Sequence, residues 1–255
     1  MKFTEHLFIS DVHLGAFTKA RSSKIEHDLI SLIDYAIARK AAVYVLGDLF
    51  DYWMEFPKNR FVPAISKIVL DKFEEYNSKV MRAVYITGNH DNWTFGHFAK
   101  RGFDVEPDFR IINIAEKNIL LMHGDGHFDS KNNFYRPFFH NLLRNKTFVH
   151  YFQAVSGSKM GLGAMRLFSD VTRKRNYRNP KSLNLQAQVI FSFGKVDSMI
   201  CGHDHIPRME TFINRTYINL GTFYEHRTIA RSVNGSIKLV KWNAETKEFQ
   251  PFGQN

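Results

Sequence analysis

Short apolar runs alternate with stretches of helical period in the first third of the chain. Apolar side chains recur at helical intervals from Ser23 to about Lys40, and Glu26 has capping-box spacing from Ser23. A second such pattern follows Pro63, a residue favoured in the first turn of a helix, and includes Ile68 on its apolar face. Strand-type apolar runs occupy 7–9, 43–46 and 80–87. This β-α-β-α-β order predicts an α/β fold with helices packed on a parallel or mixed sheet.

Hairpin patterns replace this rhythm after a short predicted helix at 95–100. Residues 110–114 and 118–122 flank a turn at 115–117, and Asn234-Gly235 is a strong two-residue hairpin signal. Further strands are predicted at 198–201, 209–213 and 217–220. The region between the two sets of strands has helical patterning. We therefore predict a core in two parts, 1–127 and 196–255, separated by a helical insertion at 128–195.

Polar side chains of metal-binding type follow five of the predicted strands. They are Asp11 and His13, then Asp48, then Asn89 and His90, then His123, and finally His203 and His205. Each motif alone is weak, because Asp-x-His is more often a helix cap beside a surface histidine and Gly-Asn is ordinary turn chemistry. In open sheets, however, ligands bind outside the carboxyl ends of the strands. Five such strand ends together predict one binding site.

The residue types at these strand ends indicate which ligand is bound. Carboxylate, amide and imidazole groups without sulfur suit manganese, iron or zinc in a reactive site better than calcium or structural zinc. Asp48 follows a central strand, so its two oxygens can bridge a pair of ions. The pattern predicts two divalent cations, with Mn²⁺ favoured.

Composition indicates a folded chain without a membrane span. Of the 255 residues, 44% are hydrophobic and 24% are charged, which argues against extensive disorder. Cys201 is the only cysteine, so no intrachain disulfide can form, and this fits a reducing compartment. Charged residues stand where a signal peptide needs an apolar core, and no run of 18 apolar residues occurs. We expect a cytoplasmic protein, and the net charge of +10 predicts acidic partners.

The basic charge is concentrated in the predicted insertion. Between Lys131 and Lys181 eleven Lys or Arg stand against one acid, Asp170, a balance of +10 that equals the charge of the whole chain. Aromatic residues are interleaved with these cations, including pairs at 134/138 and 148/152 that would share a helical face. Basic aromatic helices bind anionic membrane surfaces. Three alternatives remain: the aromatics form the insertion's own core, Arg173-Lys174-Arg175 forms a solvated face, or Arg173-Lys174-Arg175 contacts DNA. Confinement of the charge to one insertion argues against a nucleic-acid partner.

The ordered set Asp11-x-His13, Gly47-Asp48, Gly88-Asn89-His90-Asp91, His123 and Gly202-His203-x-His205 resembles the calcineurin-like metallophosphoesterase superfamily. The resemblance covers Leu7 through about Thr222. It implies a four-layer α/β/β/α sandwich in which Asp11, His13, Asp48 and His205 hold one metal, and Asp48, Asn89, His123 and His203 hold the other. Two ions that share a carboxylate activate water and hold phosphoryl oxygens. His90 would donate a hydrogen bond or proton to the phosphate, and Asp91 would orient His90 or cap the turn.

Three local features resemble the UDP-2,3-diacylglucosamine pyrophosphohydrolase family of lipid A biosynthesis. They are the run Leu46–Trp53, the run Leu121–Asp125, and the helical insertion between His123 and His203. The resemblance implies cleavage of UDP-2,3-diacylglucosamine to UMP and 2,3-diacylglucosamine 1-phosphate by an enzyme peripheral to the inner membrane. Many members of that family carry arginine at the position of His90. The substrate contacts implied are Asn89, His90, Asp129, Ser169, Arg173 and His203.

Two other functions remain open at this point. One is a phosphodiesterase or nucleotidase that acts on a water-soluble phosphoester and ignores lipid. The other is a binding scaffold on a degenerate phosphoesterase fold, against which the intact set of ligands argues. The sequence leaves the oligomeric state undetermined.

Overall fold

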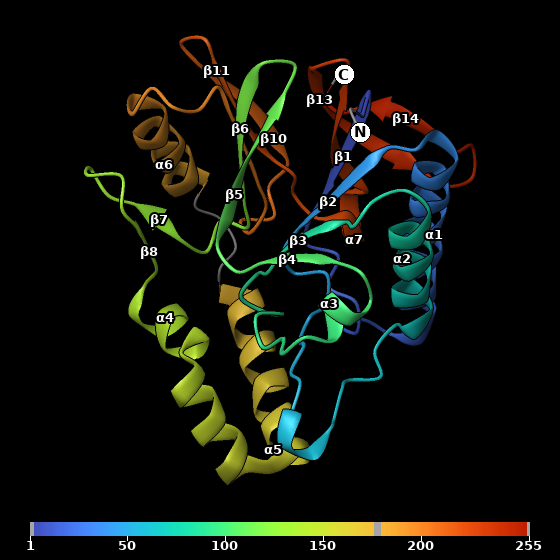
Figure 1. The fold of residues 1–255 in the computed structure, drawn as a ribbon, viewed down its shortest axis with the longest axis vertical. Helices are drawn as coiled ribbons and strands as arrows, with labels where there is room; N and C mark the ends of the chain where they lie inside the picture. Colours follow the sequence, from blue (N-terminus) through green and yellow to red (C-terminus); the bar gives the residue numbers. More distant parts are fainter. Residues whose placement is uncertain (1–2, 176–179, 254–255) are drawn as a thin grey trace.

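Two β-sheets stacked face to face form the centre of the protein (Figure 1). The computed structural model describes residues 3–175 and 180–253, without the side chains of 59, 139, 158, 159, 162, 164–175 and 180. The larger sheet contains, in spatial order, β14 (Glu248–Pro251), β13 (Ser236–Asn243), β12 (Thr228–Val233), β1 (Glu5–Ile9), β2 (Ala42–Leu46), β3 (Val84–Ile86) and β4 (Asp104–Glu106). The smaller sheet contains β10 (Arg208–Phe212), β11 (Arg215–Asn219), β9 (Ser198–Cys201), β6 (Lys117–Met122) and β5 (Phe109–Ile114).

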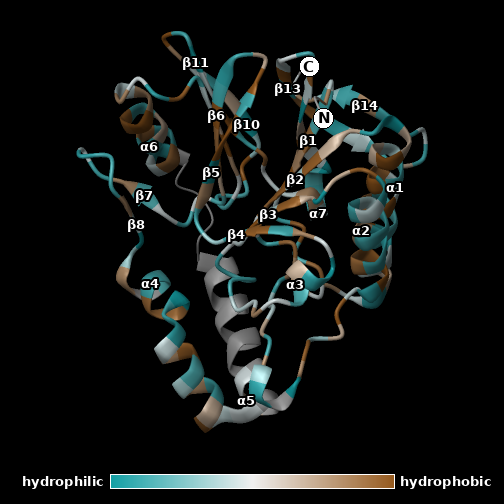
Figure 2. Ribbon diagram, viewed as in Figure 1, coloured by the Kyte–Doolittle hydropathy of each residue, from teal (hydrophilic) through white to brown (hydrophobic). Residues whose placement is uncertain are grey.

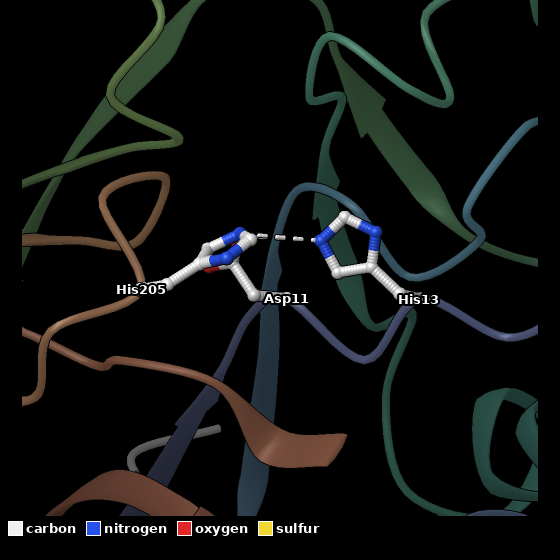
Figure 3. A group of neighbouring side chains, drawn as sticks. All are labelled: Asp11, His13 and His205. Atoms are coloured by element: carbon white, nitrogen blue, oxygen red, sulfur yellow. Dashed lines mark hydrogen bonds and ion pairs between the residues drawn. The ribbon is translucent and has the colours of Figure 1, made fainter. Parts of the chain in front are cut away.

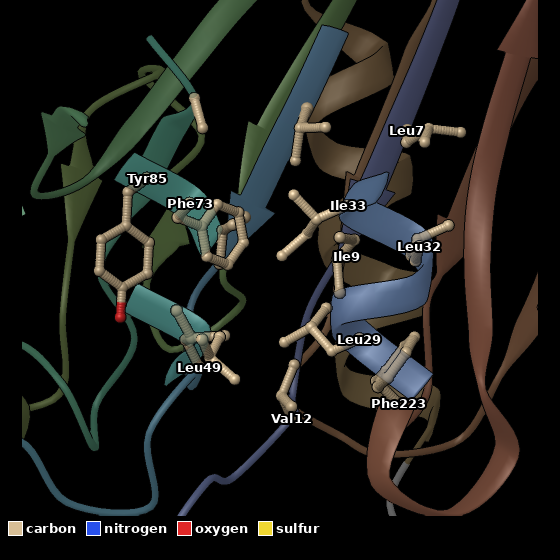
Figure 4. Close-up of a cluster of buried hydrophobic side chains, with 14 of the residues drawn as sticks. Leu7, Ile9, Val12, Leu29, Leu32, Ile33, Leu49, Phe73, Tyr85 and Phe223 are labelled. Atoms are coloured by element: carbon tan, nitrogen blue, oxygen red, sulfur yellow. The ribbon is translucent and has the colours of Figure 1, made fainter. Parts of the chain in front are cut away.

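Helices cover the outer face of each sheet. Side chains of α1 (Lys19–Arg39) and α2 (Lys67–Lys79), such as Leu29 and Phe73, pack on the larger sheet (Figure 4). A second apolar cluster fills the space between the two sheets, and a third joins the smaller sheet to α6 (Pro180–Ser192). Figure 2 shows apolar residues along the central strands. The layers run α/β/β/α, and the predicted fold class is confirmed.

The predicted starts of the first two helices are wrong. α1 begins at Lys19 after Thr18, so Ser23 lies inside the helix rather than at its cap. α2 begins at Lys67, because Ser66 adopts a left-handed backbone (φ 47°, ψ 47°) that a helix cannot continue through. The Ser66 hydroxyl donates to Glu26 Oε1 at 2.5 Å. Glu26 therefore bonds to the residue before α2 instead of closing a capping box at the start of α1. Ile68, predicted on the apolar face of the second helix, is 59% exposed.

The hairpins were predicted better than the short edge strands. The β5–β6 turn has positive φ at Ala115 and Glu116 (50° and 66°), and the β12–β13 turn has it at Asn234 and Gly235 (49° and 84°). Two such residues in sequence match the right-handed twist of the strands that they join. The run at 80–87 contributes only the three residues of β3. Three features had no clear apolar pattern and were missed: β4, β14 and the hairpin of β7 (His127–Phe128) and β8 (Phe134–Tyr135).

The insertion forms an arm, defined here as α4 (Phe138–Arg144) and α5 (Lys146–Arg175). α5 is broken at Gly157 (φ 63°, ψ 175°), and the chain reverses direction there, so the two halves of α5 form a V (Figure 1). Phe148 and Phe152 stack, with ring centroids 6.3 Å apart, and pack against a small core that includes Trp93. The predicted 134/138 helical pair does not form, because Phe134 lies in β8. Part of the aromatic content is thus the arm's own core.

The remaining short elements are a 3₁₀ turn (Pro57–Asn59), α3 (His97–Lys100) and α7 (Phe223–His226). Among the described helices, none combines the length and apolarity needed to cross a membrane.

Candidate metal centre

The five predicted strand ends meet at one place in the structure. β1, β2 and β3 are parallel neighbours in the larger sheet, and β6 and β9 are parallel neighbours in the smaller one. Parallel neighbours end at the same edge, so the loops that follow them converge. Backbone hydrogen bonds join these loops, from Asp11 N to Gly47 O at 3.2 Å and from Gly202 N to His123 O at 2.9 Å.

A first group of donor atoms comes from Asp11, His13 and His205 (Figure 3). Asp11 Oδ1 lies 3.1 Å from His205 Nε2 and 3.7 Å from His13 Nε2, and the two Nε2 atoms are 3.3 Å apart. His13 Nδ1 lies 3.0 Å from Asp51 Oδ1, and a proton donated there leaves the Nε2 lone pair directed at the group. Asp11 Oδ2 accepts hydrogen bonds from Ser10 Oγ and His203 N, which fixes the carboxylate.

A second group of donor atoms surrounds His123. Its Nε2 lies 3.3 Å from Asp48 Oδ2, 3.1 Å from Asn89 Oδ1 and 3.3 Å from His203 Nδ1. Its Nδ1 lies 2.9 Å from the Leu46 carbonyl, which can only accept, so the proton resides on Nδ1 and the Nε2 lone pair faces the group. Asp48 Oδ2 is also 3.7 Å from His13 Nε2. Asp48 therefore belongs to both groups.

These donor atoms fit a pair of divalent cations. Asp11 Oδ1 is buried and accepts no hydrogen bond from the described residues, although a buried carboxylate oxygen without a partner is costly. Several lone pairs converge at 3.1 to 3.7 Å, close to the roughly 3 Å that separates ligands bound at about 2.1 Å to one ion. Carboxylate, amide and imidazole donors suit manganese, iron or zinc.

The protonation of the metal-free cluster supports the same interpretation. Burial alone would raise the pKa values of Asp11 and Asp48, but the surrounding histidines hold both below the usual range. Burial lowers the pKa of His13 and of His123, yet the carboxylates outweigh it and raise each to about 10. Without metal, the cluster neutralises its carboxylates with protons on these two histidines. Metal ions would displace those protons.

Three glycines make room for these side chains. A Cβ atom on Gly88 would lie 2.0 Å from Asp48 Oδ1, one on Gly202 would lie 2.0 Å from Asp11 Oδ2, and one on Gly47 would lie 2.4 Å from His123 Nδ1. Each glycine precedes a donor residue on its own strand and touches a donor from another strand. The close approach of the loops therefore requires glycine at these positions.

Five of the seven candidate ligands have a left-handed backbone. The φ angles are 50° at Asp11, 50° at His13, 52° at Asp48, 76° at His203 and 64° at His205. Such angles are uncommon outside glycine and cost about 1 to 2 kcal/mol per residue. Strain of this kind concentrates at functional sites, where the surrounding structure enforces it. Nothing in the sequence indicates this conformation.

Comparison with known proteins identifies the family. The family model of calcineurin-like phosphoesterases matches residues 6–207, most of the chain. The chain belongs to this family. A UDP-2,3-diacylglucosamine hydrolase of Wigglesworthia glossinidia brevipalpis is 27% identical, with 93% of this chain and 94% of the relative covered. Hydrolases of the same name from Aliivibrio fischeri (27%; 88% and 92% covered) and Blochmanniella pennsylvanica (25%; 79% of each) are also similar.

These comparisons confirm both resemblances inferred from the motifs. Membership of the calcineurin-like phosphoesterase family implies divalent metal ions, and the donor groups described above can hold them.

In this phosphoesterase, His90 and Asp91 have different surroundings. His90 Nδ1 donates to the Asp51 carbonyl at 2.6 Å, and its Nε2 lies 3.9 Å from Asp48 Oδ2. Burial lowers the pKa of His90. Asp91 accepts hydrogen bonds from Gly88 N, Leu49 N and the Tyr85 hydroxyl, and burial raises its pKa to about 6. These are the contacts of a residue that holds the turn, and a role of Asp91 toward His90 stays a prediction.

The remaining predicted site residues lie outside this cluster. Asp129 accepts hydrogen bonds from Lys131 N and Asn133 N and so closes the tip of the β7–β8 hairpin. Ser169 and Arg173 fall within α5, with side chains outside the described part of the structure. Their assignment as substrate contacts is untested.

Sequence reasoning missed two residues that support the phosphoesterase site. Asp51 orients His13, and its position three residues after Asp48 was a usable signal. Asp125 is buried and pairs with Arg136 and Arg144, two cations that the sequence placed on the basic surface of the insertion. No sequence pattern distinguishes these two arginines from their exposed neighbours.

Proposed function

We propose that this calcineurin-like phosphoesterase cleaves the diphosphate of UDP-2,3-diacylglucosamine to UMP and 2,3-diacylglucosamine 1-phosphate. The observation that carries the proposal is the position of Asp48 between two groups of convergent donors. The substrate is suggested by relatives of that name that align with most of the chain.

The donors divide into two metal sites that share one carboxylate. Asp11, His13, Asp48 and His205 would hold one ion, and Asp48, Asn89, His123 and His203 the other. Two such ions, with Mn²⁺ the first to test, supply a nucleophile at neutral pH and stabilise charge on the phosphoryl oxygens. Ser10, Asp51 and the Leu46 carbonyl orient these ligands, as the partners of metal ligands generally do.

His90 is the residue proposed to act on the phosphate. Its backbone N–H donates to Asp48 Oδ1 at 3.0 Å, so the same residue fixes the shared carboxylate and directs an imidazole toward the site. Because Nδ1 donates to a carbonyl, Nε2 must gain a proton before it can donate. A phosphate dianion nearby favours that protonation. His90 would then donate a hydrogen bond or a proton to the leaving phosphate.

The arm is proposed to place the site at an anionic membrane surface that contains the diacylated substrate. Tyr151 and Val155, four residues apart on one side of α5, are 70% and 71% exposed, and Met160 beyond the break is 75% exposed. Lys146, the first residue of the same helix, is exposed. Apolar side chains with basic neighbours suit the interface of an anionic bilayer. Arg136 and Arg144 are excluded from this surface, because both pair with Asp125.

The test is incubation of the metal-loaded protein with UDP-2,3-diacylglucosamine in mixed micelles, with UMP release measured beside hydrolysis of an aryl phosphodiester. We expect UMP release that requires Mn²⁺ and falls below a tenth of the normal rate in Asp48→Ala. Preference for the aryl phosphodiester, together with indifference to lipid, would establish the water-soluble phosphodiesterase instead. Asp48→Ala with more than a tenth of the normal rate would refute the shared-carboxylate mechanism.

A further inference from the structure

A largely buried arginine joins the arm to the turn that carries a candidate metal ligand. Arg144 is the last residue of α4, and its side chain is 11% exposed. Nη1 donates to Thr87 Oγ1 at 3.0 Å and to the Pro107 carbonyl at 2.9 Å. Nη2 donates to the carbonyls of Thr87 (3.0 Å) and Gly88 (2.9 Å) and to Asp125 Oδ2 (2.9 Å).

The backbone that Arg144 binds lies immediately before Asn89. Asn89 Oδ1 is 3.1 Å from His123 Nε2, within the second donor group. On the other side of the turn, Gly88 N donates to Asp91 Oδ1 at 2.7 Å. The peptide groups that lead into Asn89 are therefore held from the arm by Arg144 and from the core by Asp91. A change in either contact would move the Asn89 amide relative to His123.

The geometry of these contacts requires a guanidinium. Its planar fork reaches two consecutive backbone carbonyls, a hydroxyl and a carboxylate at the same time. A lysine ammonium carries its three donors on one atom and cannot span acceptors on both sides of the fork. Asp125 Oδ2 accepts a hydrogen bond from Arg144 Nη2 at 2.9 Å and one from Arg136 Nε at 3.3 Å, so the Asp125 side chain anchors one end of the fork.

We propose that Arg144 is a positioning residue that makes the metal affinity of the Asn89 site depend on the docking of the arm. The inference rests on the proposed function, because it takes Asn89 as a metal ligand. The arm would then control metal affinity in addition to contacting lipid. When the arm is docked, Arg144 holds the Thr87–Gly88 backbone and Asn89 faces His123; when the arm is displaced, the turn loses these bonds and the ligand loses its position.

Arg136 provides a matched control within the same cluster. It is also largely buried, pairs with Asp125 at 3.3 Å and with Asp108, and donates to the Pro107 carbonyl at 3.0 Å. Among the described residues, Arg136 makes no hydrogen bond to Thr87, Gly88 or Asn89. Replacing Arg136 removes one cation from Asp125 and weakens the base of the arm, as replacing Arg144 does. The two variants differ in the contact with the turn.

The experiment titrates metal-free wild type, Arg144→Gln, Arg144→Lys and Arg136→Gln with Mn²⁺ by calorimetry, and measures Tm, kcat and KM for each. We expect both Arg144 variants to lose roughly 10- to 100-fold in affinity for one of two ions, the range for partners of metal ligands. Their kcat should fall by a similar factor, with KM changed less than about threefold, because the loss is at the metal rather than in substrate binding. Arg136→Gln should keep both affinities within about threefold.

If Arg144→Gln fails to fold, the Mn²⁺ affinity of Arg144→Lys still tests the proposal. Wild-type affinity in Arg144→Lys would overturn the proposal, because a charge alone would then suffice. Equal losses in Arg144→Gln and Arg136→Gln, in parallel with Tm, would also overturn it, since general anchoring of the arm would explain them. Wild type that binds no Mn²⁺ or releases no UMP refutes the proposed function, whereas an active wild type with unaffected Arg144 variants refutes this inference alone.

Discussion

Gly88→Ala isolates the steric requirement of the metal centre from its chemistry. The substitution adds one methyl group and changes no donor atom. That methyl carbon would lie 2.0 Å from Asp48 Oδ1, 2.7 Å from Asp48 N and 2.8 Å from Asp48 Cγ. Two of these atoms belong to the carboxyl group and one to the backbone, so rotation of the side chain cannot relieve all three contacts. The Asp48 loop must move.

The size of that movement sets the expected effect. Ordinary van der Waals contact begins near 3.4 Å, so Asp48 Oδ1 must retreat by about 1.4 Å from the new methyl group. Misplacement of a catalytic group by 1 Å costs about 100-fold in rate, and overpacking of this kind costs about 1 to 3 kcal/mol of stability. For a chain of this size the latter corresponds to a fall in Tm of roughly 2 to 12 °C. We expect kcat to fall by about 100-fold or more.

Gly163→Ala is the matched control. Gly163 lies in α5, and a Cβ atom there meets no described atom within 4 Å. Alanine favours a helix over glycine by about 1 kcal/mol, so Tm should stay constant or rise slightly. UMP release, Mn²⁺ binding and Tm are measured for both variants. A folded Gly88→Ala protein with kcat within threefold of the wild type would refute the steric reasoning. The Gly88 and Asp48 loops would then accommodate a methyl group for which the structure shows no space.

Three further predictions concern metal, pH and the arm. Mn²⁺ at 100 times its Kd should stabilise the fold by about 2.7 kcal/mol, and a chelator should remove both this gain and turnover, as thermal melts and UMP release would show. Without metal, the pKa values of His13 and His123 are raised to about 10, so protonation of these two side chains stabilises the metal-free fold. This contribution to the free energy of unfolding is complete below pH 6.5 and is lost as pH rises toward 10. The Tm difference between Mn²⁺-bound and metal-free protein should therefore widen from pH 6.5 to 8.5, and a constant difference would contradict this. The double substitution Tyr151→Ser and Val155→Ser should weaken sedimentation with anionic vesicles several-fold and leave aryl phosphodiester hydrolysis unchanged. The control Ile68→Ser, at an exposed site on α2, should change neither the sedimentation nor the hydrolysis.

The strand ends could be predicted from the sequence because they depend on local rules. Apolar runs of strand length mark β1, β2, β3, β6 and β9, and parallel neighbours end at one edge, so residues such as Asp48 and His123 had to approach each other. The two tight hairpins followed from turn chemistry for the same reason. What could not be predicted depends on contacts between distant segments. Ser66, which precedes α2, has a left-handed backbone and donates a hydrogen bond to Glu26, 40 residues earlier in the chain.

Charge counts were the least reliable guide to position. The sequence assigned Arg136 and Arg144 to one basic surface together with Lys146. In the structure both arginines are largely buried and pair with Asp125, while Lys146 is exposed. A cation becomes internal when a buried carboxylate and unpaired carbonyls lie within its reach, and these acceptors come from other parts of the chain. Composition records how many cations there are but does not reveal which of them have such acceptors nearby.

The left-handed backbone at five candidate ligands has a consequence for how such a protein changes over generations. Each of these residues costs the metal-free fold about 1 to 2 kcal/mol relative to a relaxed backbone, and glycine would remove that cost. In a lineage where hydrolysis no longer mattered, selection for activity would no longer oppose glycine at these positions, while the apolar layers would stay under selection. Decay of this enzyme would thus begin at its ligands and leave the sandwich intact. All seven candidate ligands are present in this chain.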